Sequence, residues 1–192
     1  MEPAPSFMTT YKNTGSIDQD GLNHPNWAGA TNFNIKWQKQ YTHKTPKIQS
    51  IDAHTYRVCI TLESVTPNFY PETVTEVVKW YPSSTWMQQS CSDKYRVYDQ
   101  QAVEHEEAHI QQITDIIKKA NSNWNTDAFT PTACATSKIP GSAHNKVLKT
   151  LEGKIDAYLA EQSKPIIQEV NAVGKEYHEE HKVPPMECSG CP

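Results

Sequence analysis

One short segment of the sequence contains residue types that could bind a metal ion and hydrolyse an amide bond. His105-Glu106-Glu107-Ala108-His109 places two histidines four residues apart, with a glutamate directly after the first. On an α-helix, residues i and i+4 share a face, so both imidazoles can direct a ring nitrogen at one cation. Glu106 lies one position round, where it can contact a water molecule beside that cation. The HExxH pattern therefore predicts a zinc site with His105 and His109 as ligands and Glu106 as general base.

A competing interpretation treats the same segment as a solvated acidic surface. Glu104, Glu106 and Glu107 would lie near a helix start, where the helix dipole favours negative charge, and the histidines would be their surface neighbours. This would leave His109 at an apolar phase of the helix without a partner, and an unpaired polar ring facing a core is costly. Because Ile113 continues the histidine face, the zinc interpretation is favoured.

The motif lies in a segment with helical periodicity. Residues recur at three- and four-residue spacing over 98–121, which predicts an amphipathic helix with a face formed by Ala102, Glu106, His109, Ile113, Ile116 and Ala120. A second helical pattern runs from Val147 to Tyr177, and Pro165 is expected to kink or restart it, with Ser163 as a candidate N-cap. Residues 122–145 between the two patterns are predicted to form a loop.

The first half of the chain carries strand signals. FNIKW (33–37) and TYRVCITLESV (55–65) alternate apolar and polar residues, which predicts strands with one buried face. TVTEVVKWYP (73–82) predicts a third strand or a short helix. The fold class predicted is α+β: a small antiparallel sheet, then the HExxH helix, then one long, kinked helix, in a zincin-like arrangement.

Three segments are expected along the chain. Residues 1–32, rich in Gly, Asn, Pro and Ser, predict an extended N-terminal arm, and residues 33–183 a single zincin-like metallopeptidase domain. Residues 184–192 predict a tail that holds a CxxC pair. The total of 192 residues suits one domain with its own core.

Composition and cysteine usage narrow the class of protein. The net charge of -4 and the lack of a Lys/Arg cluster in the sequence argue against a nucleic-acid partner. The sequence has no run of about 18 apolar residues, so no membrane-spanning helix is predicted. Five cysteines fit one or two disulfides formed in an oxidising compartment, so a secreted or periplasmic location is expected. The N-terminal residues lack signal-peptide features, so either the protein is made without a signal or the sequence begins after it.

A catalytic zinc ion takes three protein ligands, and the third must come from outside the motif. Three candidates lie downstream: Glu152, which forms an ExxxD pair with Asp156, and His178 and His181 near the end of the last helical pattern. The motif lies early in its own helix, so an antiparallel helix would bring its C-terminal part opposite the motif. This favours the two histidines.

The order of these features resembles a family of bacterial proteins described as secreted zinc-dependent proteases, which share a domain of unknown function. FNIKW, YRVCITL, HEEAH and EYHEEH stand at the corresponding places, over residues 33–181. Tyr177 matches the family's tyrosine, His178 stands where its aspartate would be, and His181 replaces its threonine. The resemblance implies a secreted zinc peptidase, and it leads us to expect His178 as third ligand ahead of His181 and Glu152.

These expectations combine into one reaction. Zinc held by His105, His109 and His178 would lower the pKa of a water molecule toward about 7, and Glu106 would take its proton as the water attacks a peptide carbonyl. A zinc amidase or toxin acting on cell-wall peptide would use the same residues on another amide. A non-catalytic binding module would instead hold a structural metal, for which both His178 and His181 would serve as ligands.

Overall fold

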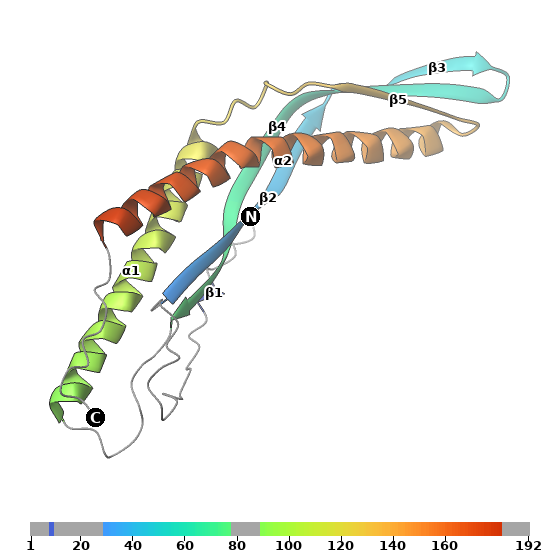
Figure 1. Cartoon of the computed structure of the whole chain (residues 1–192). Helices are drawn as coiled ribbons and strands as arrows, with labels where there is room; N and C mark the ends of the chain where they lie inside the picture. Colours follow the sequence, from blue (N-terminus) through green and yellow to red (C-terminus); the bar gives the residue numbers. More distant parts are fainter. Residues whose placement is uncertain (1–7, 10–28, 78–88, 182–192) are drawn as a thin grey trace. The chain divides into compact units, whose positions relative to one another are not determined.

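The computed structural model describes residues 8–9, 29–77 and 89–181, and its fold is α+β, as the sequence predicted (Figure 1). A small, mainly antiparallel sheet is followed by long helices. The elements in chain order are β1 (Met8–Thr9), β2 (Gly29–His43), β3 (Lys47–Asp52), β4 (Thr55–Val77), α1 (Gln89–Ser122), β5 (Thr132–Ser137) and α2 (Pro140–Glu180).

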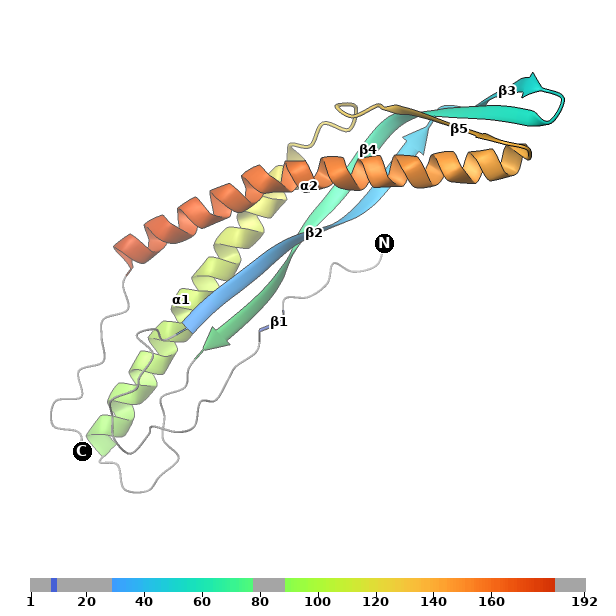
Figure 2. The same cartoon turned by 45° about the vertical axis from the view of Figure 1, so that its right-hand side comes forward.

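Strand β4 organises the sheet, because every other described strand pairs with it. Strands β3 and β5 pair antiparallel with its first part, with Gln49 opposite Arg57 and Cys59 opposite Cys134. Further along, the order is β1-β4-β2, and β1 joins in parallel register through Met8 and Val74. The arrows of β2 and β4 run side by side in opposite directions in both views (Figures 1 and 2).

The chain divides into two compact units. The first unit comprises Met1–Lys36, Tyr70–Ile117 and Glu169–Pro192, and the second comprises Trp37–Phe69 and Lys118–Gln168. Strands β2 and β4 and both helices contribute residues to each unit. The same four elements therefore build both units.

The core of the second unit joins one stripe of α2 to one face of the sheet. Fully buried residues of α2 recur every four residues, and those of β4 recur every two residues, as helix and strand geometry require. Each such aliphatic side chain contributes roughly 1.5–3 kcal/mol on burial. The residues are Val147, Leu151, Ile155 and Leu159 of α2, and Val58, Ile60 and Leu62 of β4.

The buried stripe of α1 in the first unit is partly polar. Ala102, Ile113 and Ile117 are buried, and the positions between them on the same face belong to His105, Glu106 and His109. Ile35 of β2 and Val170 of α2 are also buried in this unit. The helix therefore directs the HExxH side chains into the protein and not into solvent.

Several predicted elements are present with adjusted bounds. The helix expected over 98–121 is α1, which begins earlier, at Gln89. FNIKW lies in β2, TYRVCITLESV lies in β4, and the start of the third pattern, 73–77, is the end of β4. Most of the predicted arm, residues 78–82 of the third pattern and the predicted tail at 184–192 lie outside the described residues.

The prediction of a loop over 122–145 is confirmed for residues 123–131 but was wrong for 132–137 and from Pro140 onward. Residues 132–137 form β5, which pairs antiparallel with residues 56–61 of β4, and α2 begins at Pro140. The segment TACATS has no large apolar residue, so its strand pattern was weak, and its pairing with β4 decides its conformation. Strand β3 was missed for a related reason, because all six of its residues are exposed and show no buried face.

Pro165 does not restart α2, which is continuous from Pro140 to Glu180. The Ser163 hydroxyl donates to the Ala160 carbonyl at 2.8 Å, so it bonds back along the helix and is not an N-cap. Buried positions continue on both sides of the proline, at Leu159 and Ile166. This burial favours an unbroken helix although the proline removes a backbone donor.

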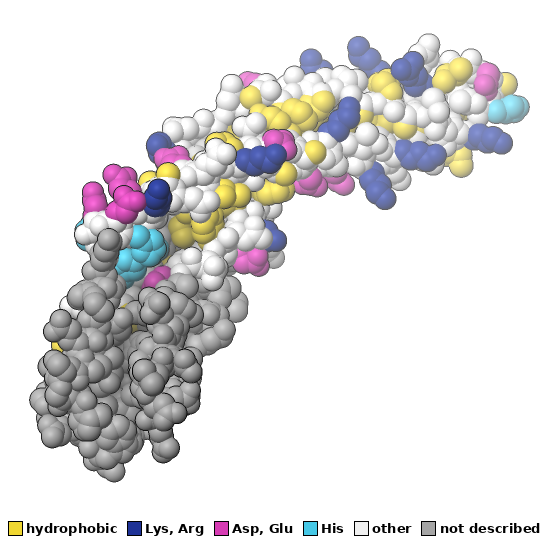
Figure 3. Space-filling model, viewed as in Figure 1, with side chains coloured by type: hydrophobic (Ala, Val, Ile, Leu, Met, Phe, Trp, Pro, Cys, Tyr) yellow, Lys and Arg dark blue, Asp and Glu magenta, His cyan; other side chains and the backbone are white. Residues whose placement is uncertain are grey.

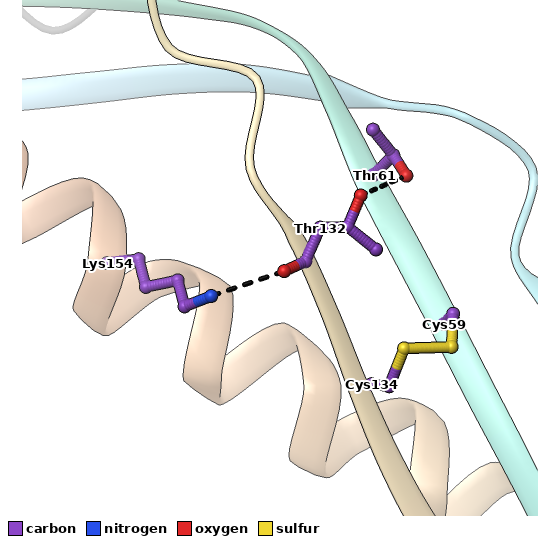
Figure 4. The surroundings of a disulfide bond; sticks show 5 residues. All are labelled: Cys59, Thr61, Thr132, Cys134 and Lys154. Atoms are coloured by element: carbon purple, nitrogen blue, oxygen red, sulfur yellow. Dashed lines mark hydrogen bonds between the residues drawn. A yellow bond between two sulfur atoms is a disulfide. The ribbon is translucent and has the colours of Figure 1, made fainter.

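One disulfide is present among the described residues, consistent with the predicted one or two. Cys59 of β4 and Cys134 of β5 are directly paired across the two strands and lie 75 residues apart in sequence (Figure 4). Beside the bridge, the hydroxyls of Thr61 and Thr132 are hydrogen-bonded at 2.7 Å. No described helix is long and apolar enough to cross a membrane.

We expect that replacing both Cys59 and Cys134 with alanine will lower the free energy of unfolding by about 4 kcal/mol, since a bridge closing a loop of this length restricts the unfolded chain. Denaturant unfolding under non-reducing conditions measures the change. Replacing both Thr61 and Thr132 with valine is the matched control, with an expected loss below about 1 kcal/mol. Equal losses in the two double variants would show that the bridge does not stabilise the fold.

Candidate metal centre

Helix α1 supplies three of the polar side chains of the site. His105, Glu106 and His109 are exposed by only 8%, 3% and 7%. By contrast, Glu104 and Glu107 on the same helix are exposed. The acidic-surface interpretation therefore describes Glu104 and Glu107, but it does not describe Glu106 or the two histidines.

Helix α2 brings a third histidine to this pair. His105 Nε2 lies 3.1 Å from His178 Nδ1 and 3.2 Å from His109 Nε2. One ligand atom from each of the three side chains lies within 4.8 Å of the others, so together they could hold a metal ion. His178 itself is exposed, and a group of histidine side chains reaches the molecular surface beside acidic side chains (Figure 3).

The spacing and chemistry of these nitrogens fit a divalent cation. Ligand nitrogens about 2.0–2.1 Å from a tetrahedral zinc ion lie about 3.3 Å from one another. The two short nitrogen–nitrogen distances at His105 are close to this value. Three imidazoles are also a ligand set that suits zinc.

The lowered pKa values of the two α1 histidines favour the neutral imidazole, which is the form that binds a metal ion. Burial and, to a smaller extent, the nearby rings of His109 and His178 lower the pKa of His105 to about 4. Burial also lowers the pKa of His109, with a smaller contribution from His178. Both rings are therefore neutral near pH 7, which leaves each a nitrogen lone pair for a cation.

Opposing effects act on the pKa of Glu106. Burial raises the pKa of its carboxyl group, while the hydrogen bond from Thr31 and the neighbouring His178 lower it. The Thr31 hydroxyl, from β2, donates to Glu106 Oε2 at 2.5 Å. This bond fixes one carboxylate oxygen and leaves the other to contact a second group.

A cavity of about 620 Å³ in the first unit opens beside these side chains. Its polar end is formed by Glu106, His109 and His178. Phe33, Ile113 and Val170 supply an apolar wall. A ligand with both an apolar and a polar part could therefore reach the histidines and the glutamate together.

Aromatic rings pack against the histidines on the helix α2 side. The Tyr177 ring lies 4.9 Å from the His105 ring and 5.0 Å from the His109 ring, between centroids. The His181 ring stacks on Tyr177 at 4.3 Å. His181 is thus a neighbour of the tyrosine and does not belong to the metal-binding group.

The remaining sequence candidates make other contacts. Glu152 and Asp156 belong to the second unit. Glu152 accepts a hydrogen bond from Tyr41 at 3.2 Å, and Asp156 forms an ion pair with Lys39. Neither carboxylate is part of the metal-binding group, so the structure brings together only His105, His109 and His178 of the residues predicted as ligands.

Sequence reasoning missed two residues of this site. Thr31 fell in the segment predicted as an arm, although it precedes Phe33 by two positions and so shares a strand face with it. Gln112 follows His109 by three positions and lines the cavity. Helical spacing could have placed Gln112 beside the motif, but nothing in the sequence shows which polar neighbour of a motif faces inward.

Comparison with protein-family models, curated proteins and solved structures found no match, so the resemblance to secreted zinc-dependent proteases stays a prediction.

We expect the purified protein to bind about one zinc ion per chain, and His105→Ala or His109→Ala to remove most of it, because each deletes a ligand nitrogen. Elemental analysis after dialysis against a mild chelator measures the bound metal. His144→Ala, a change in the second unit, is the control and should retain zinc. Full zinc retention by both motif variants would show that the three histidines are not the site.

Proposed function

We propose that this protein is a zinc-dependent peptidase that hydrolyses peptide bonds, with Glu106 as general base. One observation supports this proposal, namely the arrangement of the histidines, the glutamate and the cavity. Three histidines that could hold one metal ion stand beside a buried glutamate, and two of them, His109 and His178, line one cavity with that glutamate. A glutamate at the metal but outside its ligand set is what this hydrolysis requires.

The histidines would hold the metal through His105, His109 and His178. A bound zinc ion supplies a Lewis acid that polarises a carbonyl group and acidifies water. The chain's own contribution is to present neutral imidazoles, which burial favours at His105 and His109. The first unit also holds them on two helices, so the ligand directions are set by secondary structure.

Glu106 would move the proton. Its raised pKa brings the carboxyl group nearer to neutral pH, where a general base is most effective. The hydrogen bond from Thr31 orients the Glu106 carboxylate, because it fixes the position of Oε2. The same carboxylic acid would then deliver the proton to the leaving amine.

The set of three histidine ligands found among the described residues favours catalysis over a structural metal. A structural zinc site has four protein ligands, whereas a catalytic site has three and keeps one position open. His181 would be needed for the closed alternative, and its ring stacks on Tyr177 outside the metal-binding group. The exposure of His178 also leaves the site accessible to a substrate.

The cavity and the disulfide both support the proposed class of substrate. The apolar wall of Phe33, Ile113 and Val170 suits an apolar side chain next to the amide that is cleaved. The Cys59–Cys134 bridge suits an oxidising compartment. We therefore propose peptide or protein substrates outside the cytosol, in line with a secreted or periplasmic enzyme.

Glu106→Gln is expected to lower peptide hydrolysis by about 10²- to 10⁴-fold, because the amide keeps the size of the side chain but cannot accept a proton. Zinc content and Tm should stay close to those of the unchanged protein. Turnover of a mixed peptide library, followed by mass spectrometry, measures the activity.

The matched control is Glu107→Gln, which makes the same chemical change at the adjacent, exposed residue. We expect this variant to keep its activity. If Glu106→Gln were as active as Glu107→Gln, the peptidase mechanism would be refuted even if the protein binds zinc.

Thr31→Val is expected to move the acidic limb of the pH–activity profile to higher pH. The Thr31 hydroxyl lowers the pKa of Glu106, so its loss raises that pKa, and the carboxylate needed as base then forms only at higher pH. Asn32→Ala, at the next and exposed residue of β2, is the control and should leave the profile in place. A shift to lower pH would contradict the role assigned to Thr31.

A further inference from the structure

One buried polar atom beside the histidines has no hydrogen-bond partner in the described part of the chain. The side-chain oxygen Oε1 of Gln112 is buried and makes no hydrogen bond with any residue that the structure describes. A buried acceptor without a donor is costly, and such atoms are uncommon in folded proteins. Gln112 also lines the cavity that contains Glu106, His109 and His178. The unpaired oxygen is therefore part of the site and not of the packed core.

Gln112 is a neighbour of His109 on helix α1. The two residues are three positions apart on α1, so their side chains are neighbours on one face of the helix. His109 directs Nε2 toward His105, at 3.2 Å between the two Nε2 atoms. Its Nδ1 lies near Gly174 of α2, and both Gly174 and Gln112 line the cavity beside His109.

The metal would fix which nitrogen of His109 carries the proton. A neutral imidazole that gives the Nε2 lone pair to a cation keeps its proton on Nδ1, and this N–H requires an acceptor. Gln112 Oε1 is an unused acceptor on the adjacent side chain. The terminal torsion of a glutamine side chain is soft, and the cavity gives the carboxamide space to turn.

We propose that Gln112 is a positioning residue for the metal, and that its Oε1 accepts a hydrogen bond from His109 Nδ1–H when the metal is bound. The inference rests on the metal site of the proposed function, but it concerns metal affinity and does not depend on peptide hydrolysis. Gln112 would fix the proton and the orientation of the His109 ring, and would be paired only in the metal-loaded protein.

The test compares two substitutions at neighbouring glutamines. Gln112→Met keeps the length of the side chain and removes the acceptor, so zinc affinity should fall about 10- to 100-fold, as for other outer partners of ligand histidines. Gln111→Met is the control, because Gln111 is exposed and donates to Asp115 at 2.8 Å on the helix surface. Competition with a chromophoric chelator measures zinc affinity in both variants.

The melting temperature of the metal-free protein separates positioning from packing. Gln112→Met removes an unpaired buried oxygen, so the metal-free variant should melt at the same temperature as the unchanged protein or higher. Gln112→Glu keeps an acceptor oxygen and should bind zinc at least as tightly as the unchanged protein. We expect Gln112→Met to bind zinc more weakly while the Tm of its metal-free form is not lowered. We expect Gln112→Glu to bind zinc at least as tightly as the unchanged protein.

Two results would overturn the inference. If Gln112→Met binds zinc as tightly as Gln111→Met, while His105→Ala loses zinc, the metal site stands and the role of Gln112 is wrong. If Gln112→Met lowers the metal-free Tm or fails to fold, and Gln112→Glu folds but does not restore affinity, Gln112 acts through packing. Zinc retention in the His105 and His109 variants would instead remove the metal site on which the inference rests.

Discussion

The burial of three ionisable side chains on one face of α1 is the constraint on which the rest of the first unit depends. His105, Glu106 and His109 occupy positions between Ala102 and Ile113 that would otherwise be apolar. Burial of polar groups costs free energy unless partners compensate it. The compensation comes from other elements: β2 provides Thr31 for the glutamate, and α2 provides His178 for the histidines. A cation would complete it, because it binds the lone pairs that the three crowded rings direct at one another.

The partners that compensate this burial belong to elements that are anchored in both units. Strand β2 and helix α2 each continue into the second unit, where α2 buries a regular aliphatic stripe ending at Leu159. The disulfide between β4 and β5 adds a covalent restraint to that unit. A polar site with few apolar neighbours can tolerate its desolvation cost when its elements are stabilised elsewhere along their length. This separation of stability and chemistry is common, because functional sites are often less stable than the rest of a fold.

The parts of this protein that could be predicted from sequence are those set by local geometry. The HExxH spacing places His105 and His109 on one helix face by backbone geometry alone, and the alternation in β4 marks its buried face. An antiparallel argument favoured both His178 and His181 as the third ligand, and only the family resemblance put His178 first. Strand β5 could not be predicted in this way, because its small residues acquire strand structure by pairing with β4. Thr31 was missed because its contact with Glu106 joins residues that are 75 positions apart.

Gln112 carries no charge, which is consistent with the proposed activation of a carbonyl group by a bound zinc ion. Three imidazoles leave the two positive charges of a zinc ion undiminished, and Glu106 contributes one negative charge beside them. A glutamate at position 112 would be a stronger acceptor for His109, but its carboxylate would donate more charge through the ring and weaken the Lewis acid. A carboxamide would orient the ring and preserve the electrophilicity of a bound metal. In the proposed mechanism, a neutral partner at His109 and a single carboxylate at Glu106 would favour attack on a carbonyl over tight storage of the metal.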